Sequence, residues 1–359
     1  MSFFLSLILF LSSLIATTTF AADQVPGTII NTTNTRGSNQ ELTSQWLEVA
    51  RHDTNSSIFI KNDKSDYFKY TEYKIGEEVI LSENEGEYLI SDYYRQRQLN
   101  LLFWLFVFVV VLIGRFYGLT SLIGMFLSLV VIIKIILPQI SSGTNPIQVV
   151  IISSLFLIPT TFYLSHGINT KTNLAIAGTF ISAIITGLLA YFFTHFARIS
   201  GFSSEEANFL DIAKNGTLNI QSLLIAGIII GSIGILDDVS VSQVSVVNEI
   251  IKANPKLSFF EVFKRSMAVG RDHVASMVNT LFLVYTGAAM PLMLLFLDNS
   301  VSLSQIINTE IIAEEIVRTL VASIGLIIAV PITTLMAANY YSKNKNRLYN
   351  QDNSHSHHH

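Results

Sequence analysis

The chain of 359 residues has no cysteine and little charge, and each shortage excludes a class of protein. Without cysteine it has no disulfide framework, no thiol nucleophile and no Cys-ligated metal site. Asp, Glu, Lys and Arg make up only 13% of the residues, about half of the roughly 25% found in soluble globular proteins. The net charge of −4 leaves no basic excess to neutralise phosphates, so nucleic acid is excluded as the main partner.

The charge deficit is unevenly distributed along the chain. Residues 23–98 hold 21 charged residues among 76, whereas residues 99–341 hold 23 among 243. A single soluble domain is therefore excluded. The pattern predicts a mainly α-helical, polytopic transmembrane bundle with a small N-terminal extracytoplasmic β domain.

The N-terminal part is typical of an exported protein. Residues 1–22 form an apolar run followed by small residues, as in a secretory signal peptide, although no Lys or Arg precedes the run. An uncleaved N-terminal anchor is the alternative. Residues 23–98 alternate apolar and polar residues, as at 57–61 and 77–81, which predicts short strands of a β-barrel or sandwich. A free domain of this size is marginally stable, so we expect it to dock onto the membrane part, another copy or an envelope partner.

Residues 99–341 contain apolar runs close to the length of about 20 residues that spans a bilayer. Seven spans are predicted, followed by a cytoplasmic tail at 342–359. The seven runs are 99–114, 118–137, 147–165, 172–194, 219–238, 274–297 and 314–341.

Basic residues orient these spans, because cytoplasmic segments of membrane proteins are enriched in Lys and Arg. With the β domain outside, the outer loops hold only Arg198 and Lys214. The inner segments hold Arg115, Lys171, Lys252, Lys256, Lys264, Arg265, Arg271, Lys343, Lys345 and Arg347. The distribution predicts a cytoplasmic C-terminus.

Two connecting segments carry helix signals. Residues 195–218 are predicted to form a short helix at the outer surface. Residues 239–272 form the longest inner connection, where Ser258 and Glu261 have the spacing of a capping box. The helix that follows either rests at the headgroups or packs on the other spans. Pro291 and Pro331 are expected to kink their helices, and Glu314 and Arg318 are expected to form an i, i+4 ion pair.

The fifth run carries the first polar cluster. Gly227 and Gly231 have GxxxG spacing and Gly234 follows, which predicts close packing against a neighbouring helix. Asp237 and Asp238 stand at the inner end of this run. Charges in spans usually face a cavity or a partner.

Three readings of the segment after Asp238 remain open. If the helix continues, the side chains at 238, 242, 245 and 249 share one face and Ser242 extends the site. The alternation of 239–242 also fits a broken or extended segment of the kind that builds transporter sites. A helix end that emerges into the cytoplasm is the third reading.

A second polar cluster precedes and enters the sixth run. It consists of Arg271, Asp272, His273, Ser276 and Asn279. We expect it to face the first cluster, with Arg271 beside Asp237 or Asp238 and with His273 able to carry a proton. An interfacial cation at Arg271 and a hydrogen-bonded membrane-edge histidine at His273 are the alternatives.

Signatures of enzymes are missing from the sequence. It contains no HExxH, no GxxxxGK[ST] and no GxSxG motif. We therefore predict no enzymatic activity, no catalytic residue, no cofactor and no metal site, because the spacing of Asp237, Asp238, Asp272 and His273 is not specific for a metal. The final SHSHHH could bind metal nonspecifically and is not counted as a site.

Three long stretches carry a resemblance to a known family. They are GSIGILDDVSVSQVSVVNEI at 231–250, NPKLSFFEVFKRSMAVGRDHVASMVNTLFLVYTGAAMPLMLLF at 254–296 and the segment 308–334. Together with 94–122 and 164–179, they resemble the YibE/F-like family of bacterial multi-pass membrane proteins. The resemblance implies a permease-like protein of the bacterial cytoplasmic membrane and supplies no substrate or mechanism.

Two functional hypotheses follow for this membrane protein. The first is a transporter or permease for an unknown small solute or ion, with the two polar clusters facing one another. The second is a non-transporting scaffold or receptor, whose exported β domain binds an envelope component or a partner protein. A membrane-embedded hydrolase using paired carboxylates is a distant third. Homo-oligomer formation through residues 23–98 is compatible with the first two.

Overall fold

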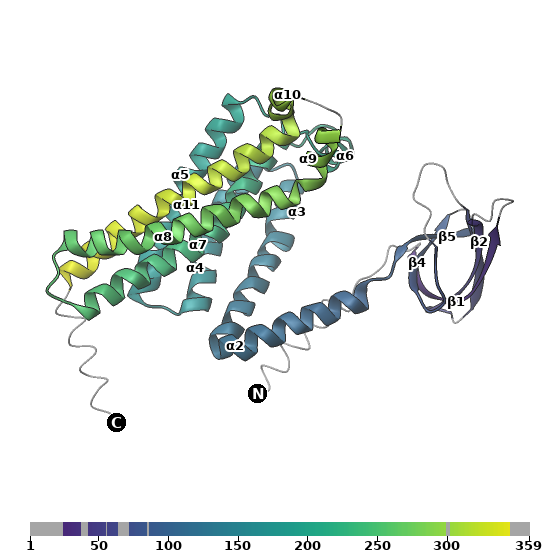
Figure 1. Cartoon of the computed structure of the whole chain (residues 1–359), viewed down its shortest axis with the longest axis horizontal. Coiled ribbons are helices and arrows are strands. Elements are labelled where there is room, and N and C mark those ends of the chain that lie inside the picture. Colours follow the sequence, from purple (N-terminus) through teal and green to yellow (C-terminus); the bar gives the residue numbers. More distant parts are fainter. Residues whose placement is uncertain are drawn as a thin grey trace. The chain divides into compact units, whose positions relative to one another are not determined.

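A computed structural model describes residues 24–36, 42–54, 56–63, 72–84, 86–298 and 302–344 (Figure 1). The signal peptide or anchor predicted at 1–22 and most of the tail predicted at 342–359 lie outside these residues. The chain divides into two compact units, 1–112 and 113–359. Each is described separately.

The first unit contains a five-stranded antiparallel sheet that curves into a half-barrel. Its strand order is β3-β2-β1-β4-β5, and the two end strands also contact one another. The strands are β1 (Gln24–Arg36), β2 (Leu42–Arg51), β3 (Ser57–Asp63), β4 (Glu78–Asn84) and β5 (Glu87–Tyr93). The β structure expected for this region is confirmed, including the strands at 57–61 and 77–81.

Alternation along the strands creates the core of this sheet. Successive side chains of a strand point to opposite faces, so Leu47 and Val49 reach one side together. Leu47 is paired with Ile60, and Val49 is paired with Ile58. The fully buried members of the core are Ile29, Leu47, Val49, Ile60, Val79 and Leu81.

The rest of the described chain is helical. The long helices are α2 (Gln96–Val131), α4 (Pro146–His166), α5 (Thr170–Phe196), α7 (Ile220–Ala253), α8 (Phe259–Ala288) and α11 (Glu310–Lys343). The short ones are the π-helix η1 (Ile132–Ile136), α3 (Leu137–Ser141), α6 (Glu205–Ala213), α9 (Met290–Asp298) and α10 (Leu303–Asn308).

Polar caps fix where several helices begin. The Ser258 hydroxyl accepts from the Glu261 amide at 3.3 Å, and the Glu261 carboxylate accepts from the Ser258 amide at 2.8 Å. The predicted capping box is therefore present at the start of α8. Asn219 caps α7, and Ser204 caps the short helix α6, which was predicted within 195–218. Such caps satisfy amides that have no partner inside the helix.

Five helices of the described chain are long and apolar enough to cross a membrane, or six if α8 and α9 are counted as one bent span. Seven were predicted. The runs 99–114 and 118–137 are counted together there as Gln96–Ser141, although this stretch joins two helices across a kink at Arg115. Arg115 interrupts it locally with φ 49° and ψ −127°. The kink lies between the two predicted runs, as the sequence indicated, and the number of spans stays a prediction.

Several boundaries also differ from expectation. Residues 239–253 continue α7, so the broken or extended reading is wrong, and the connection predicted at 239–272 shrinks to 254–258. The reading in which this end of the helix emerges into the cytoplasm stays a prediction. Helix α8 starts at Phe259, well before the predicted span at 274. It meets α9 at an angle of 63°, next to Pro291, as predicted. Pro331 leaves α11 in one piece.

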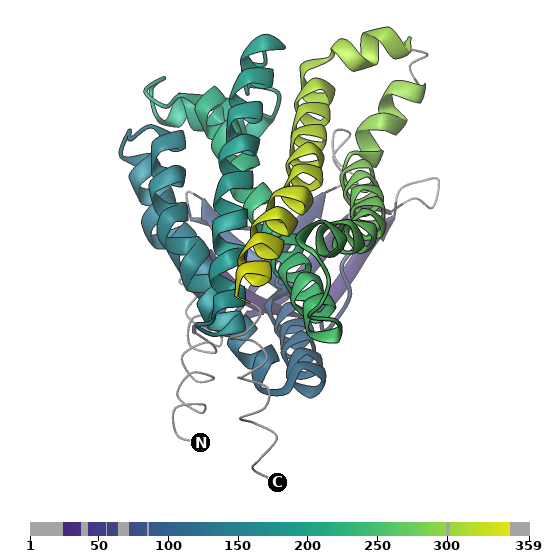
Figure 2. The same ribbon diagram turned by 90° about the vertical axis from the view of Figure 1, so that its left-hand side faces the viewer.

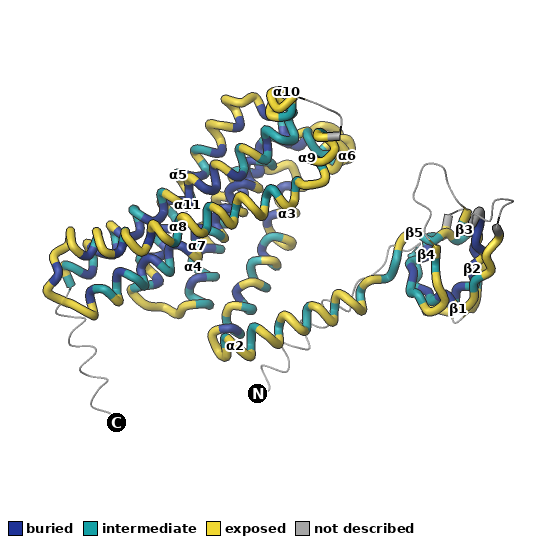
Figure 3. The backbone as a smooth tube through the Cα atoms, in the orientation of Figure 1, coloured by how far each residue is buried: buried dark blue, intermediate teal, exposed yellow. Residues whose placement is uncertain are grey.

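Helices α5, α7 and α11 contact one another and form the centre of the second unit. In Figure 2, α11 runs between α5 on one side and α8 on the other. Figure 3 shows α2 mostly exposed, whereas buried segments gather in these three central helices. About half of the apolar stretch is buried in α7 (50%) and in α11 (56%).

Candidate functional site

One face of α7 is open along the whole helix. Its members recur at helical spacing and are exposed or half-buried. They are Gly227, Gly231, Gly234, Asp238, Ser242, Ser245 and Glu249. We call this set the open face of α7. The glycines with GxxxG spacing and the polar residues that follow them therefore lie on the same face of α7.

The glycines of this face do not pack against another helix of the chain. A Cβ atom added at Gly227, Gly231 or Gly234 would meet no atom of its surroundings within 4 Å. The close contact expected from the GxxxG spacing is therefore not made within the described chain. Spacing identifies small residues on one side of a helix, but it does not say which helix faces them.

Other glycines allow the close helix contacts. Gly178 of α5 lies against the Thr333 side chain of α11, and Gly325 of α11 lies against the Thr186 side chain of α5. A Cβ at Gly178 would come within 2.5 Å of the Thr333 hydroxyl oxygen. These two positions need glycine because no room remains for a side chain.

Asp238 has a neighbour that sequence reasoning missed. The ring of His166, at the end of α4, interacts electrostatically with Asp238 and with Lys171 at the start of α5. Asp237 is half-buried and has Asp238 as its charged neighbour. The polar spacing that defined the two predicted clusters does not include the turn between α4 and α5. Its short connection, in which Asn169 caps α5, could have signalled that His166 and Lys171 stay close together.

The second predicted cluster lies on α8 and is not joined to the two aspartates by an ion pair. Arg271, Asp272, Ser276 and Asn279 are exposed, and His273 is half-buried. Across the described ranges, no ion pair connects Arg271 to Asp237 or Asp238. The expected neutralisation by Arg271 is therefore not made. His273 Nε2 is buried and has no hydrogen-bond partner among the described residues.

A buried amide connects three helices beside the open face. The Gln243 side chain of α7 donates to the Ser266 carbonyl of α8 at 3.1 Å and to the Thr334 hydroxyl of α11 at 2.7 Å. It also lies against Gly270, where an added Cβ would come within 3.0 Å of it. Nothing in the spacing of the polar residues singled out Gln243. Its burial, 2% exposed, shows that it holds the helices together.

The outer carboxylates of α11 also differ from the prediction. Arg318 pairs with Glu315 at 3.4 Å and not with Glu314. Glu310 accepts three hydrogen bonds from the segment after α5, from the Ser200 amide and hydroxyl at 2.6 Å each and from the Gly201 amide at 3.1 Å. This carboxylate connects two segments that are 110 residues apart.

The chemistry available at the open face is that of oxygen ligands. One exposed carboxylate, two half-exposed hydroxyls and a helix backbone left uncovered by glycines lie along one line. In the described part of the chain, no group of three or more His, Asp or Glu residues could hold a metal ion. The arrangement suits weak, successive contacts with a polar solute or ion.

The apolar helices, together with the polar open face of α7, define a multi-span helical membrane protein that carries a separate β-sheet unit. More specifically, the chain belongs to the YibE/F-like family, because the model of the YibE/F-like protein family matches residues 102–343. The resemblance read from the sequence is thereby confirmed. Comparisons with curated proteins and with solved structures gave no match.

Proposed function

We propose that this protein is a membrane transporter in which a small polar solute or an ion passes along the open face of α7. The observation that carries the proposal is the exposed Asp238 carboxylate on a helix long and apolar enough to span a membrane. Exposure of a charge to lipid is costly, so such residues usually line a water-filled path or meet a partner. Among the residues that the structure describes, no cation forms an ion pair with Asp238, which leaves its charge available for a solute.

The residues above and below Asp238 support a path and not a single isolated site. Gly231 and Gly234 precede it by two helical turns and one, while Ser242 and Ser245 follow at the same spacing. Glycines uncover backbone carbonyls and the serines add hydroxyl oxygens. A carboxylate among neutral oxygens favours a cation or a proton over an anion.

We further propose that the protein resides in the bacterial cytoplasmic membrane, with the β domain outside and the C-terminus in the cytoplasm. The support is the excess of Lys and Arg in the segments assigned to the inside and the family membership.

Flux through reconstituted protein tests the transport proposal. The full chain is placed in liposomes that enclose a pH-sensitive dye, which reports proton uptake after a K⁺ diffusion potential is imposed. Tracer uptake of Na⁺ and Rb⁺ is measured in parallel without the K⁺ ionophore. Asp238→Asn should abolish the flux seen with the native protein. Glu206→Gln is the matched control, because it removes an exposed carboxylate from α6, outside the open face, and it should leave the flux unchanged. Equal flux through Asp238→Asn and native protein would refute the assignment.

A scaffold or receptor is the second candidate, favoured by an apolar patch on the β domain. Trp46 on β2 and Phe59 on β3 are 46% and 70% exposed. They lie on the same face of the sheet, since Trp46 is paired with Lys61 and Phe59 with Glu48. Exposed aromatic pairs mark partner surfaces. Deletion of residues 23–92 separates the two functions: a scaffold would lose its phenotype, whereas a transporter would retain flux in liposomes.

A further inference from the structure

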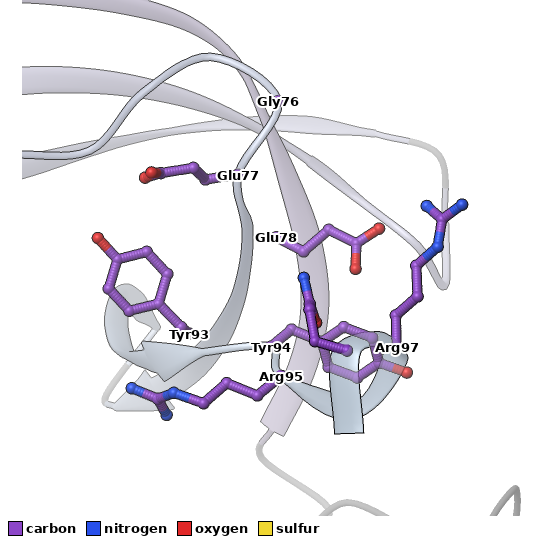
Figure 4. Close-up of a pocket in the computed structure, with 8 residues that line it drawn as sticks. Gly76, Glu77, Glu78, Tyr93, Tyr94, Arg95 and Arg97 are labelled. Atoms are coloured by element: carbon purple, nitrogen blue, oxygen red, sulfur yellow. The ribbon is translucent and has the colours of Figure 1, made fainter. Parts of the chain in front are cut away.

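A pocket of about 400 Å³ lies in the first unit, where the sheet meets the first turn of α2. Its charged lining residues are Glu77, Glu78, Arg95 and Arg97 (Figure 4). The other lining residues are Gly76, Tyr93, Tyr94 and Gln98. The volume falls within the range of about 300–1,000 Å³ typical of ligand pockets. Two carboxylates and two guanidinium groups give the lining no net charge.

Partners inside the protein satisfy half of these charges. Arg95 pairs with Asp92 at 2.7 Å and lies over the Tyr93 ring, 5.6 Å from its centroid. Glu77 accepts a hydrogen bond from the Lys74 amide at 2.9 Å. Burial, followed by the Glu77 carboxylate, raises the pKa of Tyr93, so that its hydroxyl stays protonated and can donate.

Glu78 and Arg97 are the two charges left over. The Oε2 atom of Glu78 is buried, and it has no hydrogen-bond partner among the residues that the structure describes. Arg97 is exposed and forms no ion pair within the described ranges, with Glu78 or any other residue. In Figure 4 both side chains extend to the same side of the view, away from Glu77, Tyr93 and Arg95. A buried carboxylate oxygen without a partner is costly, which points to a missing donor.

The position of the pocket along the chain indicates the source of its ligand. Gln98 lines the pocket, and the apolar run that makes α2 a candidate span starts at the next residue, Leu99. The pocket therefore borders the start of a candidate span, which is where headgroups lie. Tyr and Arg are the residues that proteins use at this depth.

We propose that this pocket binds a ligand that carries a primary ammonium next to a phosphate, namely the headgroup of phosphatidylethanolamine. The ammonium donates to the Glu78 carboxylate, and the phosphate binds the Arg97 guanidinium. The balanced charge of the lining suits a zwitterion better than an anionic headgroup. A choline headgroup, whose nitrogen bears no hydrogen, cannot satisfy the buried Glu78 oxygen.

Lipid binding to the full chain in detergent tests this proposal. Calorimetric titration compares dihexanoyl phosphatidylethanolamine with its phosphatidylcholine and phosphatidylglycerol counterparts. The ethanolamine lipid should bind at least roughly tenfold more tightly than the other two, as expected for a charge-assisted hydrogen bond. Equal affinity for the three lipids, or a preference for phosphatidylglycerol, would overturn the proposal.

Two variants test the roles of Glu78 and Arg97 in lipid binding. Glu78→Gln keeps the shape of the side chain and should abolish the preference for ethanolamine over choline. Arg97→Gln changes an exposed side chain, so it leaves folding intact, and it should weaken binding of all three lipids by roughly tenfold. Glu87→Gln, an exposed carboxylate on β5, and Lys61→Gln, an exposed cation on β3, are the matched controls and should change neither property. Unchanged binding in both pocket variants would contradict the site.

Free phosphoethanolamine separates the lipid from a soluble ligand with the same chemistry. If the acyl chains hold the headgroup at the membrane, the lipid binds at least tenfold more tightly than free phosphoethanolamine. Equal affinities would overturn the assignment to a lipid and leave a soluble amino-phosphate as the ligand of Glu78 and Arg97.

Discussion

The buried face and the open face of α7 use polar residues in opposite ways. On the buried face, Gln243 has both its amide hydrogens directed to partners on α8 and α11. On the open face, Asp238 is exposed and the neighbouring glycines touch no other helix. The comparison separates polar groups that hold the helices together from those left free to meet a solute. Substitutions on the two faces should therefore change the unfolding free energy by different amounts.

The largest expected effect comes from filling a glycine contact. Gly325→Leu places a side chain where the Thr186 side chain already lies, so α5 and α11 must separate. We expect a loss of about 3 kcal/mol or more in unfolding free energy, at the upper end of overpacking effects. At Gly231, on the open face, an added Cβ meets no atom of the described residues within 4 Å, so Gly231→Leu should leave stability unchanged or slightly higher through its helix propensity. Thermal unfolding followed by circular dichroism in detergent measures the stability of both variants. Similar losses of stability in the two variants would contradict the distinction between the buried and open positions.

The next effect in size concerns the buried amide. Gln243→Ala removes two hydrogen bonds and leaves a cavity among three helices, which should cost about 2 kcal/mol. Ser242→Ala changes the adjacent residue, whose hydroxyl bonds only to the Val239 carbonyl of its own helix at 3.2 Å. Its effect should stay within about 0.5 kcal/mol. The same denaturation experiment distinguishes them, and a costlier Ser242 variant would contradict the assignment of the two faces.

A smaller stability effect is expected at the carboxylate itself. Asp238→Asn keeps the size of an exposed side chain, so the unfolding free energy should change by no more than about 0.5 kcal/mol. The same variant should therefore lose flux while it keeps its stability. A large destabilisation would mean that Asp238 supports the fold and would assign it to the residues that hold the helices together. The His166→Gln variant, measured in parallel, tests whether that support depends on His166.

The smallest expected effect is the contribution of exposed Arg–Asp pairs to the stability of the β domain. Hydrogen bonding to Arg51 lowers the pKa of Asp53 below its ordinary 3.8, and Arg95 does the same for Asp92. A carboxyl with a lowered folded pKa adds stability above its unfolded value and loses it as the pH falls through the folded value. The β domain should therefore weaken slightly below about pH 4, and less so in Arg51→Gln. Trp46 fluorescence in a Trp104→Phe background reports this transition, and an identical acid response in Arg51→Gln would exclude the contribution.

Local rules predicted much of the fold but little of the site. The capping box at Ser258, the bend next to Pro291 and the strands of the β domain follow from a few neighbouring residues, so the sequence contains them. The contacts of Gln243 and Gly325 depend on which helices become neighbours, and no spacing within one helix encodes that choice. The same holds for Asp238, whose charge acts on His166 and which forms no ion pair with Arg271 within the described ranges.

The hydrogen bond between Gln243 and Thr334 also has a consequence for how the protein is made. Its two residues are 91 positions apart, so the amide enters the membrane well before its partner has been synthesised. At about 5–20 residues per second, the ribosome needs on the order of 5–20 s to reach Thr334. During that interval the carboxamide of Gln243 depends on water, lipid headgroups or the insertion machinery for hydrogen bonding. Arrival of α11 then releases those temporary partners, which makes the last helix the step that completes assembly of the bundle.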